Sequence, residues 1–183
     1  MEPEDQENVM RRLIGWFGAS AVVVAMLVLA TAARADDKAQ KIAPDKLPQK
    51  IKDAINGRFP GAEVTSAEKE VENNQVVYDI ELKHKGRKYE MDIKEDGTIL
   101  EIEKEVAAKD VPAALPKAVQ ARFPKAKIKE VMEVNKVEGK KETPQHYEVT
   151  IETADKKKME VIVSLDGKSV KTEAEEKKEK EKK

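Results

Sequence analysis

The sequence contains no cysteine, only two histidines and few aromatic residues, and each shortage narrows what the chain can be. Without cysteine there are no disulfide bonds, so each small folded unit must be held together by its own apolar core. His84 and His146 have no second histidine and no cysteine at ligand spacing, so both are interpreted as surface side chains. We therefore expect no metal site and no cofactor.

Motifs of catalytic sites are also missing. The chain has no Gly-x-Gly-x-x-Gly, Walker loop, Gly-x-Ser-x-Gly or His-Glu-x-x-His. Asp96 and Asp166 lack the further oxygen ligands of a calcium loop. Carboxylates are abundant, but pairs such as Asp79 and Glu81 alternate with apolar residues, which is typical of a solvated strand face. We predict that the protein is not an enzyme.

The first 35 residues differ in composition from the rest. A basic start at Met10–Arg12 precedes an uncharged run of 21 residues, 13–33, and Ala33 and Ala35 then place small residues before Asp36. This order predicts a signal peptide over residues 1–35, or from Met10 if translation begins there, and a periplasmic or secreted mature protein. The run is also long enough to span a bilayer, so an uncleaved membrane anchor is the alternative.

Charge is balanced beyond residue 35, where 32 acidic and 32 basic residues are interspersed. A phosphate-backbone binder needs a basic excess on one face, and a polybasic membrane-surface protein needs clustered lysine and arginine. The balance argues against both classes. We expect no nucleic-acid partner, and contact with a membrane only if the signal segment is uncleaved.

An internal repeat organises the chain beyond the signal segment. Residues 47–64 align without gaps to residues 111–128 at an offset of 64, and both segments contain an early proline, an apolar stripe and a Phe-Pro-x-Ala corner. The stripe at helical spacing predicts an amphipathic helix of about three turns, which the second proline ends. In the first copy the stripe consists of Ile51, Ala54, Ile55 and Phe59.

Alternating apolar and charged residues follow each predicted helix and predict antiparallel strands. The expected strands are 62–71, 78–82, 89–93 and 98–102 in the first copy and 147–151 and 159–163 in the second. Since Tyr78 corresponds to Tyr147 at an offset of 69, we expect the first hairpin loop of the second copy to be about five residues longer, near residues 138–144. The aromatic residues beyond the signal segment fall on the apolar face and are expected in the core: Phe59, Tyr78, Tyr89, Phe123 and Tyr147.

The predicted fold class is α+β, with two tandem repeats that each pack one helix on a four-stranded antiparallel sheet. The expected divisions are a signal peptide at 1–35, a linker at 36–45, the first repeat at 46–104, the second repeat at 110–171 and a charged tail at 172–183. Lysine and glutamate dominate the tail, which predicts a disordered or frayed-helical segment.

Several short motifs of the repeats match one family pattern: Leu47-Pro48, Ala54-Ile55, Arg58-Phe59-Pro60-Gly61-Ala62, Tyr78-x-Ile80-x-Leu82, Gly86-x-x-Tyr89 and Asp96-Gly97-x-Ile99-Leu100. In these motifs the chain resembles the PepSY-like family, also called beta-lactamase-inhibitor-like. The resemblance implies a bacterial periplasmic or secreted protein, similar in fold to a two-repeat inhibitor whose sheet surface grips a beta-lactamase. It also implies a likeness to PepSY domains, which are linked to restraining peptidases.

The chain departs from the family pattern in its second copy. Lys125 stands in place of Gly61, and Met159 stands in place of Tyr89. The beta-lactamase inhibitor is stabilised by disulfides, which this cysteine-free chain cannot form. The resemblance therefore bears on the fold more than on inhibition.

The leading functional hypothesis is an exported, non-enzymatic binding module, an inhibitor or regulator of an envelope or secreted enzyme, that uses its sheet surface. The alternatives are a periplasmic protein that binds a small ligand, peptide or cation, and a membrane-anchored envelope spacer. Joining of the two sheets into one concave surface would favour the binding module. The outward positions of the central strands form the candidate partner-binding face: Asp79, Glu81, Lys83, Lys88, Glu90, Asp92, Glu148, Thr150, Glu152, Lys158, Glu160 and Ile162.

Overall fold

The computed structural model describes residues 39–72 and 74–180. The predicted signal peptide lies outside the described residues. Within the two described ranges, no helix is both long enough and apolar enough to cross a membrane. The elements follow one another as β1 (Gln40–Lys41), η1 (Pro44–Lys46), α2 (Gln49–Arg58), β2 (Glu63–Glu72), β3 (Gln75–His84), β4 (Arg87–Lys94), β5 (Ile99–Glu105), α3 (Ala114–Arg122), β6 (Lys127–Glu138), β7 (Lys141–Glu152), β8 (Lys158–Ser164), β9 (Val170–Thr172) and α4 (Glu173–Lys180).

The described strands form one nine-stranded antiparallel sheet, in which each strand pairs with its neighbours in the sequence from β1 to β9. The predicted antiparallel pairing is confirmed. The sheet is a single one, however, because β5 pairs with β6 from Glu101↔Lys136 to Glu105↔Met132 and so joins the two halves. Unpaired strand edges attract other chains, and this junction removes one edge from each half.

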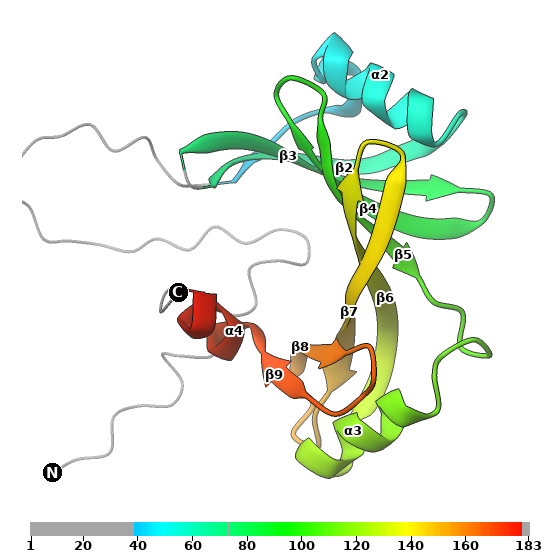
Figure 1. Cartoon of the computed structure of the whole chain (residues 1–183), viewed down its shortest axis with the longest axis vertical. Coiled ribbons are helices and arrows are strands. Elements are labelled where there is room, and N and C mark those ends of the chain that lie inside the picture. Colours follow the sequence, from blue (N-terminus) through cyan, green and yellow to red (C-terminus); the bar gives the residue numbers. More distant parts are fainter. Residues whose placement is uncertain (1–38, 73, 181–183) are drawn as a thin grey trace, which may run out of the picture.

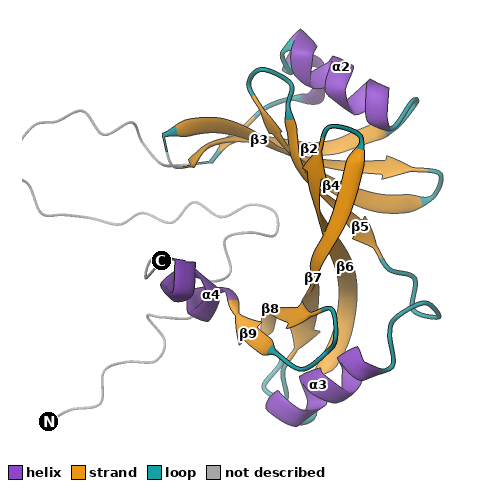
Figure 2. Ribbon diagram, viewed as in Figure 1, coloured by secondary structure: helices purple, strands orange, loops and turns teal. Residues whose placement is uncertain are grey.

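Two helices cover one face of the curved sheet, one over each half (Figure 1). Helix α2 buries Ile51 and Ile55 against the strands of the first half, and α3 buries Leu115 and Val119 against those of the second. Both helices lie on the convex side (Figure 2). The opposite, concave face is therefore left to the charged side chains that alternate with the core residues.

The aromatic residues lie in or against the two apolar cores. Phe59 and Tyr78 are buried, and the ring of Phe59 lies 4.5 Å from that of Tyr89. Phe123 and Tyr147 are half-buried and pack against the core under α3. The expectation that these side chains serve the core is confirmed.

A tight turn ends both covering helices in the same way. In the first turn the N–H of Ala62 donates to the carbonyl of Phe59 over 3.0 Å, and the corresponding bond in the second turn measures 3.1 Å. The third residue of each turn has a positive φ, of 75° at Gly61 and 67° at Lys125. A proline followed by a positive φ is the pattern of a type II turn, which favours glycine at that position. The second turn therefore keeps its shape with a strained lysine.

The hairpin of β6 and β7 corrects one prediction. The extra residues of the second copy do not lengthen a loop at residues 138–144, since the two strands stay paired as far as Glu138↔Lys141. A register shift between Val134 and Asn135 absorbs the uneven number of residues. The sequence of residues 141–145 does not alternate as a strand should, but pairing with β6 imposes the extended conformation.

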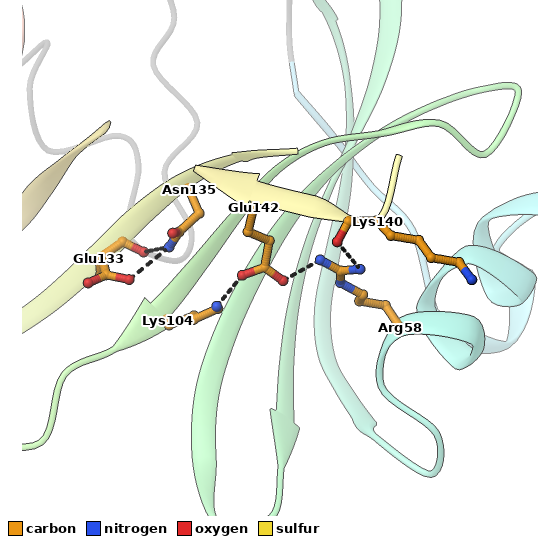
Figure 3. Close-up of polar contacts among 6 residues, drawn as sticks. All are labelled: Arg58, Lys104, Glu133, Asn135, Lys140 and Glu142. Atoms are coloured by element: carbon orange, nitrogen blue, oxygen red, sulfur yellow. Dashed lines mark hydrogen bonds and ion pairs between the residues drawn. The ribbon is translucent and has the colours of Figure 1, made fainter. Parts of the chain in front are cut away.

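The tip of this hairpin contacts the first half of the molecule (Figure 3). Val137 is only 7% exposed and belongs to the core under α2. The Glu142 carboxylate accepts hydrogen bonds from Arg58, at the end of α2, and from Lys104, in β5, while Arg58 also reaches the carbonyl of Lys140. Burial works to raise the pKa of Glu142, but the hydrogen bonds from the two cations outweigh it and hold the pKa below its usual value.

The segments predicted as a linker and as a disordered or frayed-helical tail both contain short elements. In the predicted linker at 36–45, β1 pairs with β2. In the predicted tail at 172–183, the Thr172 N–H and hydroxyl donate to the Glu175 carboxylate over 2.8 and 3.1 Å at the start of α4, and the N–H bond is one half of a capping box. Glutamate, lysine and alanine are strong helix formers, so a composition that cannot build a core still supports a surface helix.

Lys125→Gly is expected to raise the free energy of unfolding by about 0.5–1 kcal/mol, because glycine adopts a positive φ without the steric cost that lysine has there. Urea titration followed by circular dichroism measures the change. The reciprocal variant Gly61→Lys should lower the free energy by a similar amount. Two variants with the stability of the wild type would show that the turn does not require a positive φ.

Glu142→Gln is expected to lower the free energy of unfolding at pH 7 by about 1 kcal/mol, after allowance for the partial exposure of its ion pairs. Because the pKa of Glu142 is lower in the folded state, its stabilising effect is present above its usual value of 4.5 and is lost as the pH falls through the folded-state pKa. Urea titrations at neutral and acidic pH should therefore show the deficit of the variant shrinking in acid. Glu138→Gln, at an exposed position of the same hairpin, is the control and should leave the unfolding midpoint unchanged. A pH-independent deficit would contradict the role given to the carboxylate charge.

Candidate functional site

The concave face places carboxylates directly opposite one another on neighbouring strands. Alternation dictates this arrangement, because Ile80, Met91 and Ile102 lie between the acidic residues and face the core. Like charges in directly opposed positions destabilise a sheet. The pairing of β2 to β5 forms two acidic rows, one of Glu68, Asp79, Asp92 and Glu101 and the other of Glu81, Glu90 and Glu103.

The second half adds further carboxylates across the β5–β6 junction. Glu148 lies opposite Met132 on one side and Ile162 on the other, and Glu160 lies opposite Thr150. Together the two halves enclose an acidic cavity of about 50 Å³. Its lining residues are Asp79, Glu90, Asp92, Glu101, Glu103, Met132, Glu148, Thr150 and Glu160.

Burial and mutual repulsion hold protons on several of these carboxyl groups. Burial, followed by the charge of Glu90, raises the pKa of Asp79 to about 7. Burial also raises the pKa of Glu103 to about 11, with Glu148 as the strongest neighbouring charge. Burial raises the pKa of Glu148 to about 7 and that of Glu160 to about 9, and a hydrogen bond between the two favours the proton on Glu160. At neutral pH the face therefore carries fewer negative charges than carboxyl groups.

A lysine supplies positive charge at the edge of the acidic cavity. The Lys88 ammonium lies 2.8 Å from the Glu90 carboxylate and 3.5 Å from that of Glu130. Burial works to lower the pKa of Lys88, but the hydrogen bond to Glu90 and the surrounding carboxylates raise it above its usual value. Lys88 therefore stays charged and neutralises part of the face, while carboxylates dominate the cavity itself.

The structure brings half of the predicted face residues into one place. Glu81 and Lys88 adjoin the acidic cavity through their contacts with Glu90. Lys83, Glu152 and Lys158 lie towards strand ends, and Ile162 lines a different cavity. The predicted residues that line the acidic cavity are Asp79, Glu90, Asp92, Glu148, Thr150 and Glu160.

Three residues of the acidic cavity were missed by the sequence-based prediction. In β5, Glu101 and Glu103 lie on either side of the buried Ile102. This is the same alternation of acidic and core residues that identified the outward positions of β4, so it could have identified these two residues as well. Met132 carried no such signal, because the register shifts of β6 decide which face it occupies. Local alternation thus finds the carboxylates but not the residue at the junction.

A second cavity, of about 320 Å³, lies beneath α4 on the same face of the second half. Its His146 places Nε2 3.4 Å from a carboxylate oxygen of Glu148. His84 lies elsewhere and packs against the ring of Phe59 with centroids 5.6 Å apart. Within residues 39–72 and 74–180, no group of three or more histidine, cysteine, aspartate or glutamate side chains is arranged to hold a metal ion. The cavity is lined by Gln145, His146, Ile162, Ser164, Ser169, Lys171, Glu176 and Glu179.

The acidic cavity can exchange protons for positive charge. A cation close to a carboxyl group favours its ionised form and so lowers its pKa. A lysine or arginine side chain that entered the cavity would therefore displace protons from carboxyl groups such as Asp79 and Glu148. Binding of positive charge at this face would be coupled to proton release.

Comparison with protein families matches both halves of the chain to PepSY-type sequence patterns. Residues 37–103 match the family described as peptidase propeptide and YPEB domain. Residues 86–171 match the family described as beta-lactamase-inhibitor-like, PepSY-like. The resemblance predicted from the sequence is confirmed. No functionally curated protein matches the chain.

Two of the solved structures that resemble this chain, with TM-scores above 0.5, support the fold. A DUF2874 family protein from Bacteroides uniformis is 15% identical, with a TM-score of 0.54 over 69% of this chain and 89% of its own. A protein from Bacteroides eggerthii that is described as periplasmic is also 15% identical, with a TM-score of 0.51 over 68% of this chain and 88% of its own. A BLIP-like protein from Bacteroides fragilis is 22% identical, with a TM-score of 0.45 over 68% of this chain and 84% of its own.

The protein is expected to be more stable near pH 5 than near pH 8. The pKa values of Asp79, Glu148 and Glu160 are higher in the folded state than their usual values, so the folded state binds extra protons from about pH 4 to about pH 9. Stability falls with rising pH wherever the folded state binds more protons. Thermal unfolding should show a loss of at least about 1 kcal/mol between the two pH values, or about 2–4 °C in the midpoint.

Neutral substitutions identify the groups responsible for this pH dependence. The combined variant Asp79→Asn, Glu103→Gln, Glu148→Gln and Glu160→Gln should flatten the profile between pH 5 and pH 8. Glu63→Gln with Glu95→Gln removes two exposed carboxylates and should retain the profile of the wild type. A wild-type midpoint that rises over this interval would contradict the assignment of protons to the concave face.

Proposed function

We propose that the protein is an exported protein-binding module that binds through its concave face. The matches of residues 37–103 and 86–171 to the PepSY and PepSY-like sequence patterns support this proposal. The observation that carries the proposal is the β5–β6 pairing, because it merges the strands of both halves into one continuous surface. Helices α2 and α3 lie on the other side of the sheet (Figure 1), so a partner can approach without displacing them.

The dimensions of the cavities favour a macromolecular partner over a small ligand. Small-molecule sites have volumes of about 300–1,000 Å³ and mostly apolar linings. The acidic cavity measures about 50 Å³, which suits one inserted side chain. The cavity under α4 is larger, but Ile162 is the single large apolar residue of its lining.

The charge of the concave face supports a partner that presents lysine or arginine. Carboxyl groups from β3, β4, β5, β7 and β8 converge on the acidic cavity, and a cation inserted among them would relieve their repulsion. Complementary charge of this kind raises the association rate and excludes wrong partners more than it raises affinity. Lys88, at the edge of the cavity, would fix the register of the approaching chain by repulsion.

The partner is proposed to be an exported enzyme that binding restrains, with no catalytic step on this chain. Support comes from the two family descriptions, one of which refers to a peptidase propeptide and the other to a beta-lactamase inhibitor. A periplasmic location is proposed on the predicted signal peptide and on the description of the Bacteroides eggerthii protein as periplasmic.

The two halves are proposed to be copies of one unit that act together. Helix α2 is followed by β2 to β5, and α3 is followed by β6 to β9. The 64-residue offset of the repeated segments supports the same division. Each half then contributes one part of a shared binding surface.

Affinity capture with two matched variants tests the proposal. The wild-type protein, immobilised, is incubated with the periplasmic extract of the producing cell, and retained proteins are identified by mass spectrometry. Asp92→Asn, Glu101→Gln and Glu148→Gln together remove three carboxylates of the acidic cavity. We expect this variant to bind the captured partner at least about 10-fold more weakly, since each lost charge contact costs a substantial part of 1.4 kcal/mol.

The control variant removes the same number of charges outside the concave cavity. It combines Asp53→Asn, Glu95→Gln and Asp110→Asn, all at exposed positions, and should bind as the wild type does. Equal binding by both variants would contradict the concave face as the binding surface. Absence of any partner, together with a rise in melting temperature on addition of divalent cations or small peptides, would favour the ligand-binding alternative.

A further inference from the structure

Helix α4 lies on the concave side of the second half, opposite the side that α3 covers (Figure 1). Ile162 belongs to this concave face, because it pairs with Glu148 and alternates with the core residues Val161 and Val163. It lines the second cavity together with side chains of α4. The C-terminal helix therefore covers part of the surface that the proposed function requires.

In the part of the chain that the structure describes, no helix covers the corresponding position of the first half (Figure 1). Asp92 occupies the place in β4 that Ile162 occupies in β8, three residues after Tyr89 and Met159 respectively. Asp92 lines the acidic cavity. After β5 the chain continues into α3 on the convex side, so among the described residues no helix follows the first half onto the concave face.

We propose that α4 is an autoinhibitory strap, which occupies the concave face of the second half until a protein partner displaces it. The inference rests on the proposed function, because it assumes that a partner uses this face. It adds a regulatory element that controls how much of the face is open.

The strap is anchored at its first turn. The Arg122 guanidinium, from the end of α3, donates to both carboxylate oxygens of Glu175 over 2.6 and 2.7 Å and to the carbonyl of Val170 over 2.6 Å. Further along, the Lys171 ammonium lies 2.5 Å from the Glu179 carboxylate. These contacts, with the hydrogen bonds from Thr172 to the Glu175 carboxylate, fix where the helix starts and which way it points.

The strap is nevertheless easy to displace, because the contacts that anchor it are polar. Residues 173–180 contain no apolar side chain larger than Ala174, so α4 contributes little to either core. Its eight residues are fewer than the roughly 12–15 that an isolated helix needs to be stable in water. Exposed ion pairs are also weak and are screened by salt. A partner that offers apolar contact to Ile162 would therefore compete effectively with α4.

The absence of native cysteine provides a direct test in the full chain. Ile162→Cys places one thiol beneath α4, and Lys83→Cys places one at an exposed position on the concave face of the first half. The reaction rate of each thiol with a neutral maleimide is measured alone and in combination with Glu175→Gln or Arg122→Ala. Each measurement is made at about 0.05 M and about 1 M NaCl, and the melting temperature of every variant is recorded.

We expect Glu175→Gln, Arg122→Ala and high salt each to raise the rate at residue 162 about fivefold or more, because each weakens the anchor of α4. The rate at residue 83 should stay within about twofold. An unchanged rate at residue 162 under all three conditions would overturn the proposal, and so would an equal rise at both positions, which indicates general loosening. If Arg122→Ala lowers the melting temperature strongly, the thiol rates of Glu175→Gln and of the salt series decide whether release of α4 exposes residue 162.

These rates require no partner, so the strap and the proposed function can fail separately. Once a partner has been captured, Glu175→Gln should bind it about fivefold more tightly than the wild type, since less of the face is covered. Equal affinity would overturn the autoinhibitory role even where the thiol rates show that α4 is released.

Discussion

The pairing of β5 with β6 is the contact on which the rest of the structure depends. A unit of about 60 residues buries too little surface to be more than marginally stable, and this chain has no disulfide to compensate. The junction gives each half a neighbour along its open edge, and the long β6–β7 hairpin then carries Val137 into the core of the first half. The same pairing aligns the outward faces of both halves, which is why carboxylates separated by up to 81 positions in the sequence, from Asp79 to Glu160, line one cavity.

The concave face shows how a chain with almost no net charge can build a surface rich in carboxyl groups. Acidic and basic residues are equal in number beyond residue 35, but alternation along the strands directs acidic residues such as Asp79, Asp92 and Glu101 to one face. Several lysines lie at strand ends or exposed positions instead, as Lys83 and Lys158 do. The balanced composition therefore concealed an acidic surface. The protons held on the buried carboxyl groups are the consequence of this sorting.

The elements that depend on local sequence could be predicted, and those that depend on distant pairing could not. Proline and an apolar stripe located α2 and α3, and strict alternation located β4. The β6–β7 hairpin was misread because its second strand contains Pro144 and does not alternate until it pairs. The tail was predicted as disordered or frayed-helical, and the anchor of α4 could not be predicted because Arg122 belongs to a helix about 50 residues earlier in the chain. At the site, the alternation of inward and outward residues along each strand identified Glu90 and Glu148 as outward-facing. The cavity could not be predicted in this way, because it forms only when the two halves join into one curved sheet.

The position of Val137 also sets the order in which the molecule can finish folding. The other buried members of the core under α2 come from residues 47–102, so this core lacks one side chain until residue 137 has been synthesised. At about 5–20 residues per second, the delay between residues 102 and 137 is about 2–7 seconds. Throughout that interval Arg58 also lacks Glu142, its partner in the finished structure. The first half is therefore synthesised before its core can be completed. A chaperone or protease acting on the emerging chain would encounter this half while its core still lacks Val137.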